Sequence, residues 1–341
     1  MRILFTPHVE HYTIGLSEEL SKYVRLALLT TKRFDTSAKQ IVMLPIPYLA
    51  GLMKKIIFKF PIGIDVIHVN SSQEGIFVGN FEKTLVTEHG WPDPRLVESS
   101  ERKYYERERN ALLQLYEIGV PIVTISNYSA EMLHNIYGVK VSRVIYHGLL
   151  KNFLSNRPRK MPRKHRVLWV SRLVSIKEPF ILLEALKKIS DKAELKTVIK
   201  GSGPLHGIIK KYIENYNLKS SVSVFSEIIP FREMPKIYSS CSIFIHTCSH
   251  EPFGLAVLEA MGSALPVLVP DRGGAPEVAG NAAFKFRAGD PDDLCEKLLN
   301  LMDDEELYEK LSEKSLERAR EFSWQRAAKE YFAIYKLLWR I

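Results

Sequence analysis

Residues 250–259 read His-Glu-Pro-Phe-Gly-Leu-Ala-Val-Leu-Glu and place a tight turn directly before a helix. The preceding run, Ser242–His246, is short and apolar and predicts a buried strand. From Gly254 onward apolar residues recur at helical spacing through Met261, and Gly262 ends the pattern. The order is therefore strand, turn, helix, which is the repeating unit of a parallel α/β sheet.

The same turn can hold an anion between two carboxylates. A helix start leaves unpaired backbone N–H groups and a partial positive charge, so a diphosphate fits beside Phe253, Gly254 and Leu255. Gly254 has no Cβ and lets the ligand come close. Glu259 lies about 7 Å further along the helix, where its carboxylate can accept two ribose hydroxyls, and Glu251 lies on the other side of the turn. From spacing alone, a surface acid at a strand end and an ordinary helical glutamate are an equally good interpretation.

The rest of the chain continues this alternation in two series. Strand patterns at Ile3–Thr6, 66–69 and 84–87 alternate with helical ones, one of them around Leu16–Tyr23, and the first series closes near residue 148. Residues 151–165 are polar, basic and proline-containing, as an exposed linker would be. The second series starts at Val167 and ends in an amphipathic helix after Phe322, with Ser323 as its expected cap. We predict an α/β fold of two doubly wound, Rossmann-like domains, residues 1–155 and 156–323.

Length and composition agree with two soluble α/β domains. The chain has 341 residues, and 46% of them are hydrophobic. The longest apolar stretches are far shorter than the roughly 20 residues that cross a bilayer, and the N-terminus reads as a strand rather than a secretion signal, so we expect a cytoplasmic protein. The three cysteines, Cys241, Cys248 and Cys295, have neither disulfide nor zinc-site spacing.

The net charge of +9 fits an anionic substrate, a nucleic acid or an anionic lipid surface, and charge alone does not choose among them. Basic residues gather at Lys54–Phe60 and at Lys151–Arg166. The first segment mixes lysines with aromatic and aliphatic residues, as a membrane-surface segment does. A solvated helix face beside a core strand is the alternative, and peripheral membrane contact therefore stays an open expectation.

Two cations follow the first strand of the second domain. Arg172 and Lys177 lie in Ser-Arg-Leu-Val-Ser-Ile-Lys, residues 171–177. Ligands of doubly wound sheets bind at the carboxyl ends of the strands, so both cations are expected at the same edge as Glu251. An arginine fork and a lysine can neutralise a diphosphate leaving group without a metal.

Together these motifs resemble those of the retaining glycosyltransferases of family 4. Glu251 and Glu259 match the family's Glu-x7-Glu motif, and residues 171–177 resemble the family element that begins Gly-Arg-Leu and ends in Lys, with Ser171 in place of glycine. Residues 261–267 and 273–278 also follow in family order. Lys200–Leu205 is similar to the family's Gly-x-Gly-Pro-Leu turn, which implies that Gly203 lines the nucleotide pocket. A plain turn before a helix is an equally good interpretation of this segment.

The resemblance implies a GT-B fold, in which two Rossmann-like domains face a central cleft and the last helix, about residues 324–341, packs on the first domain. It also implies that a nucleotide diphosphate sugar binds mainly to the second domain. Arg172 and Lys177 would then contact the diphosphate, Glu259 the ribose, and Glu251 the sugar hydroxyls. No metal or other cofactor is expected, and no nucleic acid partner.

In the first domain the match is looser. Thr87-Glu88-His89-Gly90 ends a strand and matches the family's strand-end histidine, which implies that His89 faces the donor sugar. The family's Gly-Gly loop after the first strand has no counterpart here except around His11–Gly15, so Gly15 is the candidate for that role.

An Asp-x-Asp pattern at residues 290–292, which is the metal motif of the other major glycosyltransferase fold, has a simpler interpretation. It precedes a helical run, so Asp290 is expected to be an N-cap and Asp292 a first-turn acid.

The function expected from these features is retaining transfer of a hexose-type sugar to a glycan, lipid-linked or small-molecule acceptor. Because the sequence identifies no carboxylate nucleophile, front-side attack with the leaving phosphate as base is the favoured mechanism. The alternatives are a hydrolase, epimerase or phosphorylase on the same fold, or a non-catalytic protein that binds polyanions or membrane surfaces.

Overall fold

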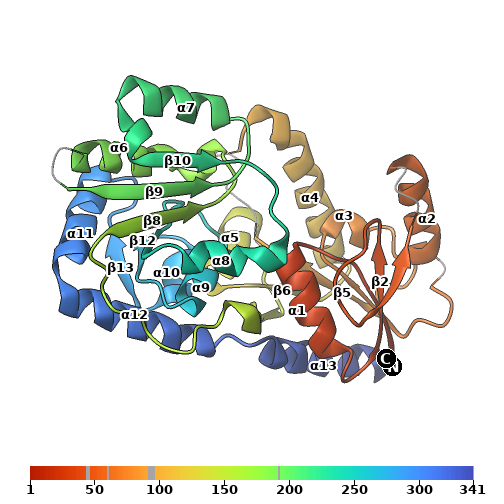
Figure 1. Cartoon of the computed structure of the whole chain (residues 1–341). Coiled ribbons are helices and arrows are strands. Elements are labelled where there is room, and N and C mark those ends of the chain that lie inside the picture. Colours follow the sequence, from red (N-terminus) through yellow and green to blue (C-terminus); the bar gives the residue numbers. More distant parts are fainter. Residues whose placement is uncertain (44–46, 60, 91–96, 191–192, 341) are drawn as a thin grey trace. The chain divides into compact units, whose positions relative to one another are not determined.

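The computed structural model describes residues 1–43, 47–59, 61–90, 97–190 and 193–340 (Figure 1). The chain forms two compact units, the first made of Met1–Leu150 and Phe322–Ile341 and the second of Lys151–Glu321. Phe60 and Ile341, which belong to segments discussed above, lie outside the described residues. Among the described helices, none is both long enough and apolar enough to cross a bilayer.

The first unit is built on a seven-stranded parallel sheet with the order β3-β2-β1-β4-β5-β6-β7. The central strand β1 carries the continuous apolar run Ile3-Leu4-Phe5 because helices cover both faces of the sheet (Figure 1). The chain order reverses between β1 and β4, which is where doubly wound sheets bind ligands. The strands are β1 (Arg2–Phe5), β2 (Arg25–Thr30), β3 (Lys39–Val42), β4 (Val66–Val69), β5 (Thr84–Glu88), β6 (Ile122–Thr124) and β7 (Arg143–Val144).

The helices of the first unit are α1 (Glu10–Leu20), α2 (Pro47–Lys59), α3 (Ser72–Gly75), α4 (Ser99–Glu117) and α5 (Asn127–Tyr137). Helix α1 begins and ends earlier than the expected Leu16–Tyr23. It begins at Glu10, an acid in the first turn, and its first residues His11, Tyr12 and Thr13 are already buried. Gly15 therefore lies inside a helix, and the expectation of a Gly15 loop was wrong.

Helix α13 (Trp324–Arg340) returns from the end of the chain to pack on α1. Its buried face, including Trp324 and Tyr331, joins the core of the first unit. Gly15 accommodates this packing, because a Cβ at that position would lie 2.1 Å from Nε1 of Trp324. The predicted cap is confirmed, since the backbone N–H of Arg326 donates to Oγ of Ser323 at 3.2 Å.

The second unit repeats the design with a six-stranded parallel sheet in the order β10-β9-β8-β11-β12-β13. The predicted fold class, two doubly wound α/β domains, is confirmed. Here the order reverses between β8 and β11, so the carboxyl ends of these two strands are the expected ligand edge. The strands are β8 (His165–Val170), β9 (Leu195–Lys200), β10 (Val222–Phe225), β11 (Ile243–Ile245), β12 (Val267–Pro270) and β13 (Ala283–Phe286).

Helices cover both faces of the sheet of the second unit. They are α6 (Pro179–Ile189), α7 (His206–Asn215), α8 (Met234–Ser239), α9 (Leu255–Gly262), α10 (Gly274–Ala279), α11 (Pro291–Asp303) and α12 (Glu305–Arg320). One face of the sheet forms a hydrophobic core with α6, α7, α11 and α12. Oδ1 of Asp290 accepts the backbone N–H groups of Asp292 and Asp293 at 2.9 and 3.0 Å. Asp290 is thus the N-cap of α11, as predicted, and Asp292 lies in its first turn.

Candidate active site

The loop after β8 is fastened to the end of β11. Residues Ser175–Lys177 form a 3₁₀ turn, followed by Glu178 in the left-handed region at φ 52°. The carboxylate of Glu178 accepts the backbone N–H of Ser249 at 2.7 Å and its hydroxyl at 3.1 Å. Oγ1 of Thr247 donates to the carbonyl of Lys177 at 2.8 Å. These bonds hold Lys177 at a fixed place beside the strand end.

Lys177 and Glu251 form an ion pair there. Nζ of Lys177 lies 2.6 Å from Oε2 of Glu251, and Nε2 of His246 lies 3.4 Å from the same oxygen. Burial would raise the pKa of Glu251, but the charge of Lys177 and the contact with His246 outweigh it and hold that pKa well below its usual range. Burial likewise opposes the charge of Lys177, and Glu251 more than compensates, so the lysine pKa is raised. Both groups are therefore charged at neutral pH.

Helix α9 begins directly after this pair. Gly254 precedes the helix with φ 99°, a conformation that side chains rarely adopt. The α10 turn packs closely on the same segment, because the backbone N–H of Gly274 donates to the carbonyl of Glu251 at 2.6 Å and a Cβ on Gly274 would lie 2.2 Å from the carbonyl oxygen of Pro252. Phe253 is buried, and Leu255 is the first helical residue. The first N–H groups of α9 thus start next to the Lys177–Glu251 pair.

Glu259 lies in the second turn of α9 and is buried. The hydroxyl of Tyr238, at the end of α8, donates to its Oε2 at 2.7 Å. Glu259 therefore has a fixed side-chain position.

Arg172 is exposed on the loop after β8, near enough to Lys177 that its charge, after burial, opposes the raised pKa of that lysine. Its loop rests on the glycine turn after β9. A Cβ on Gly203 would lie 2.5 Å from the carbonyl oxygen of Leu173, and one on Gly201 would lie 1.8 Å from that of Ser171. The backbone N–H of Leu173 also donates to the carbonyl of Ser202 at 2.8 Å. The geometry gives Gly203 a positioning role under Arg172.

His246, Cys248 and Glu251 offer potential metal ligand atoms within 4.8 Å of one another. Burial raises the pKa of the Cys248 thiol to about 12, and its Sγ donates to the carbonyl of Ile176 at 3.0 Å. A protonated thiol is a poor metal ligand, and Lys177 already contacts the carboxylate. In this structure the three side chains thus contact the protein itself, through Ile176 and Lys177 and through one another.

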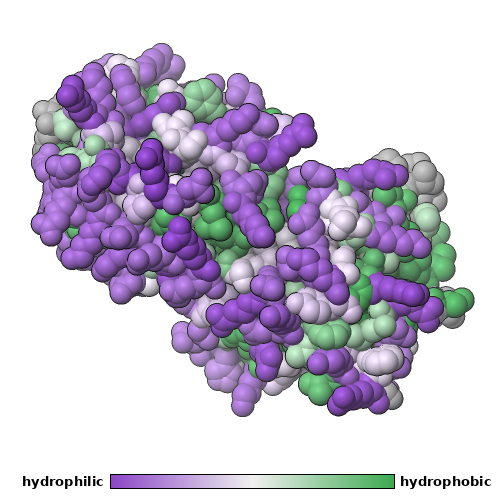
Figure 2. All heavy atoms as spheres, turned by 60° about the horizontal axis from the view of Figure 1, so that its bottom comes forward, coloured by the Kyte–Doolittle hydropathy of each residue, from purple (hydrophilic) through white to green (hydrophobic). Residues whose placement is uncertain are grey.

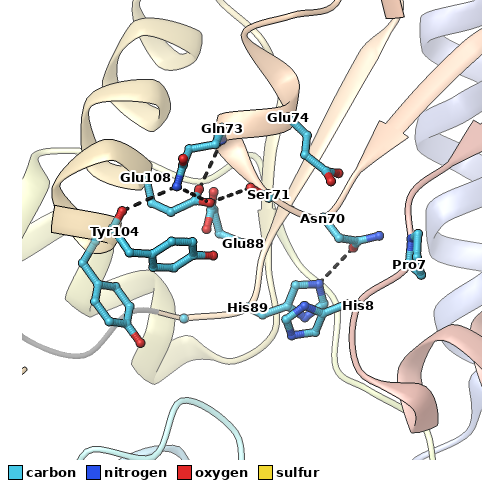
Figure 3. A pocket seen from close by; sticks show the side chains of 12 residues that line it. Pro7, His8, Asn70, Ser71, Gln73, Glu74, Glu88, His89, Tyr104 and Glu108 are labelled. Atoms are coloured by element: carbon cyan, nitrogen blue, oxygen red, sulfur yellow. Dashed lines mark hydrogen bonds between the residues drawn. The ribbon is translucent and has the colours of Figure 1, made fainter. Parts of the chain in front are cut away.

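The first unit has a cavity of about 450 Å³ at the carboxyl ends of β1, β4 and β5 (Figure 3). Its wall is mostly polar and includes two aromatic rings from α4. The lining residues are Pro7, His8, Asn70, Ser71, Gln73, Glu74, Glu88, His89, Gly90, Tyr104, Tyr105 and Glu108.

Glu108 organises one side of this cavity. Oε1 accepts the hydroxyl of Ser71 at 2.6 Å and Nε2 of Gln73 at 3.0 Å, and Oε2 accepts the backbone N–H of Gln73 at 3.2 Å. Burial and then the charge of Glu108 raise the pKa of the Tyr104 hydroxyl. A buried carboxylate held by neutral donors and flanked by tyrosine is suited to bind hydroxyl groups.

His89 lies on the opposite side of the cavity, directly after β5. Its Nε2 lies 2.9 Å from Oδ1 of Asn70, and its ring stacks on His8 with centroids 3.7 Å apart (Figure 3). Burial, and then the neighbouring His8, His147 and His68, hold the pKa of His89 well below its usual value. The ring is therefore neutral. With Nε2 donating to Asn70, Nδ1 is the acceptor.

Several of these residues escaped the sequence analysis. Glu178, His246 and Tyr238 hold predicted residues in place, and Asn70, Tyr104 and Glu108 line the cavity. A strand-end position was the available signal for Asn70, which follows β4, and for His246, which follows β11. Tyr104 and Glu108 lie on a highly charged helix, where nothing in the pattern distinguishes them from solvated residues.

The strand orders of the two parallel sheets, with a ligand-binding edge where each order reverses, define the class of protein. The chain superimposes on the structure of HepE from Anabaena in complex with UDP-glucose with a TM-score of 0.76, 18% identity and coverage of 98% of this chain and 99% of that one. The class is the GT-B fold, as predicted.

Residues 151–318 match the family model described as Glycosyl transferases group 1. The match covers nearly all of the second unit and just under half of the chain, and it confirms the resemblance to glycosyltransferases inferred from the motifs. A probable sucrose-phosphate synthase of Thermosipho melanesiensis is 34% identical over 158 residues, which is 45% of this chain and 36% of the relative. An uncharacterised glycosyltransferase of Methanocaldococcus jannaschii is 27% identical over 288 residues, 81% of this chain and 76% of the relative. The match to the first relative thus spans about a third of that protein's length.

Proposed function

We propose that this protein is a retaining glycosyltransferase that moves a hexose-type sugar from a nucleotide diphosphate sugar to a glycan, lipid-linked or small-molecule acceptor in the cytoplasm. The observation that carries the proposal is the Lys177–Glu251 pair, which lies beside the start of α9 with Glu259 one turn further on. A cation, free helix N–H groups and a second carboxylate are the groups that a nucleotide diphosphate requires.

The donor would bind to the second unit. Its diphosphate would contact Lys177, Arg172 and the first N–H groups of α9, and the ribose hydroxyls would bind Glu259. Glu251, which stays ionised because Lys177 compensates its burial, would accept hydroxyls of the sugar. Support for this donor class comes from the shared fold of HepE, whose structure was solved with UDP-glucose.

Bond cleavage leaves a nucleoside diphosphate with one additional negative charge. Lys177 and Arg172 would stabilise that charge, and we propose that they serve in place of a metal ion. The acceptor oxygen would attack from the face that the diphosphate leaves and pass its proton to a phosphate oxygen, so the anomeric configuration is retained.

The cavity of the first unit is the proposed acceptor site. Glu108 and Tyr104 would bind acceptor hydroxyls on one side, and the neutral His89 ring, held by Asn70, would form the wall on the other. This wall suits a sugar or another polyhydroxylated group.

A thermal-shift screen of nucleotide sugars tests the proposal. A donor present at a hundred times its Kd adds about 2.7 kcal/mol to the free energy of unfolding, so the correct donor raises Tm by several degrees. Product analysis with and without candidate acceptors then separates transfer from hydrolysis, epimerisation and phosphorolysis. Polyanion binding without any response to nucleotide sugars would refute the proposal.

A further inference from the structure

Helix α2 of the first unit is apolar on the side that faces the solvent. Leu52, Met53 and Ile56 are 48%, 40% and 54% exposed, and they share one face of the helix because they stand at positions i, i+1 and i+4. A helix that covers a sheet normally exposes its polar side. The outer face of α2, defined by these three residues, therefore requires an explanation.

The inner side of α2 is fixed to the unit in the usual way. Phe58 is buried in the core of the first unit, and Lys54 forms an ion pair with Glu74 of α3. The outer face is thus a stable feature of the folded unit. Phe58 is buried whereas Ile56 is exposed, so α2 packs on the unit through a different face from the one that carries Ile56.

Cations flank the outer face. Lys55 and Lys59 are exposed on the same helix, and Nζ of Lys55 lies 4.4 Å from the ring centre of Phe77, which is itself exposed. Figure 2 shows hydrophobic surface gathered with hydrophilic side chains on the right of the view, the side on which Figure 1 places α2. The chain as a whole carries a net charge of +9.

We propose that the outer face of α2 docks on the surface of an anionic lipid bilayer. Leu52, Met53 and Ile56 would enter the boundary between headgroups and acyl chains, while Lys55 and Lys59 would contact anionic headgroups. The contact is peripheral. It does not depend on the proposed transfer activity, because it involves neither the Lys177–Glu251 pair nor the cavity residues.

Vesicle flotation with the full chain tests this. We expect the protein to float with phosphatidylcholine vesicles that contain about one third phosphatidylglycerol, to bind pure phosphatidylcholine much less, and to dissociate as salt is raised. The double substitution Leu52→Ser with Ile56→Ser should weaken binding about tenfold or more, because it removes the inserted apolar surface. Lys55→Ala should weaken it about fivefold.

Ile228→Ser is the matched control, because Ile228 is 97% exposed but lies in the second unit. It should leave vesicle binding unchanged, and all variants should keep the wild-type Tm. Equal binding to neutral and anionic vesicles, or a double variant that floats like the wild type, would overturn the proposal. So would a wild-type dimer in light scattering that the double variant converts to a monomer, since the face would then bind a second copy of the chain.

Discussion

The two units solve the same problem, holding polar groups at the carboxyl edge of a parallel sheet, in opposite ways. The second unit uses charge, since Lys177 and Glu251 pair across 74 residues of sequence at 2.6 Å. The first unit uses neutral partners, since Glu108 is held by Ser71 and Gln73 and its buried histidines are uncharged. The edge with the Lys177–Glu251 ion pair suits a diphosphate, whereas the edge whose carboxylates have neutral partners suits hydroxyl groups. A transferase needs one site of each kind.

This difference predicts that, as pH falls, the free energy of unfolding of the first unit decreases at a higher pH than that of the second. His68 is buried between Tyr335 and Thr87, and burial lowers its pKa to about 3. Because the unfolded chain binds the proton at a pKa of about 6.5, stability is complete above that pH and falls as pH drops below it, by about 2 kcal/mol per such histidine at pH 5. His89 and His147 also have lowered pKa values, caused first by burial.

The contribution of Glu251 to stability is lost over a different pH range. Its pKa is lowered in the folded state, so its contribution is present above the unfolded value of about 4.3 and is lost only as pH falls below that. Burial also lowers the pKa of His165 in β8, but the first unit holds several such histidines, His8, His68, His89 and His147. Hydrogen exchange at pH 7 and 5, corrected for intrinsic rates, should therefore show β1, β4 and β5 losing more protection than β8 and β11. Greater loss of protection in the second unit than in the first would contradict this prediction.

Lys177→Met should leave Glu251 buried without its nearest cation. We expect a loss of about 3 kcal/mol in the free energy of unfolding, together with loss of nucleotide-sugar binding. Lys188→Met is the control, because Lys188 pairs with Asp292 at the exposed surface of the same unit, and it should leave the free energy of unfolding nearly unchanged. Denaturant unfolding measures the loss of stability in both variants. Equal losses would show that the buried ion pair stabilises the unit no more than an exposed one does.

Glu259→Ala should weaken nucleotide binding by about ten- to a hundredfold, because it removes the buried carboxylate that we propose as the acceptor of the ribose hydroxyls. Tyr238→Phe removes one hydrogen bond to the same carboxylate and should weaken binding by only a few-fold. Calorimetric titration with the nucleoside diphosphate measures the two effects. If Tyr238→Phe were as damaging as Glu259→Ala, the glutamate would be a structural partner of the tyrosine rather than a ligand contact.

Glu108→Gln tests the cavity at the sheet edge of the first unit and should have the smallest effect on activity. The volume is kept while a strong acceptor becomes a weaker one, so the KM for the acceptor should rise about tenfold with little change in nucleotide affinity. Glu106→Gln, on the exposed side of the same helix, should leave both quantities unchanged. A loss of nucleotide affinity in Glu108→Gln would contradict the assignment of the cavity to the acceptor.

Features that depend on a few neighbouring residues could be predicted from the sequence. The strand, turn and helix around Gly254, the caps at Asp290 and Ser323, and the βα alternation all follow from short-range patterns. Lys177 and Glu251 were expected at one edge because parallel strands end together.

Features that depend on contacts distant in sequence could not be predicted. The close packing of Gly15 in α1 against Trp324 joins residues more than three hundred positions apart in the chain. The cavity is likewise assembled from Asn70, Tyr104 and Glu108, whose positions become adjacent only when α4 packs on α3. Sequence patterns report local burial, but they do not report which elements meet.

The most direct test of the account compares turnover and nucleotide binding in Glu251→Gln. The substitution keeps the volume of the side chain and removes the charge that pairs with Lys177. We expect transfer to fall by about a hundredfold or more while the Kd for the nucleoside diphosphate changes only a few-fold. Transfer at the wild-type rate would contradict the role of Glu251, and with it the assignment of the edge with the Lys177–Glu251 ion pair to catalysis.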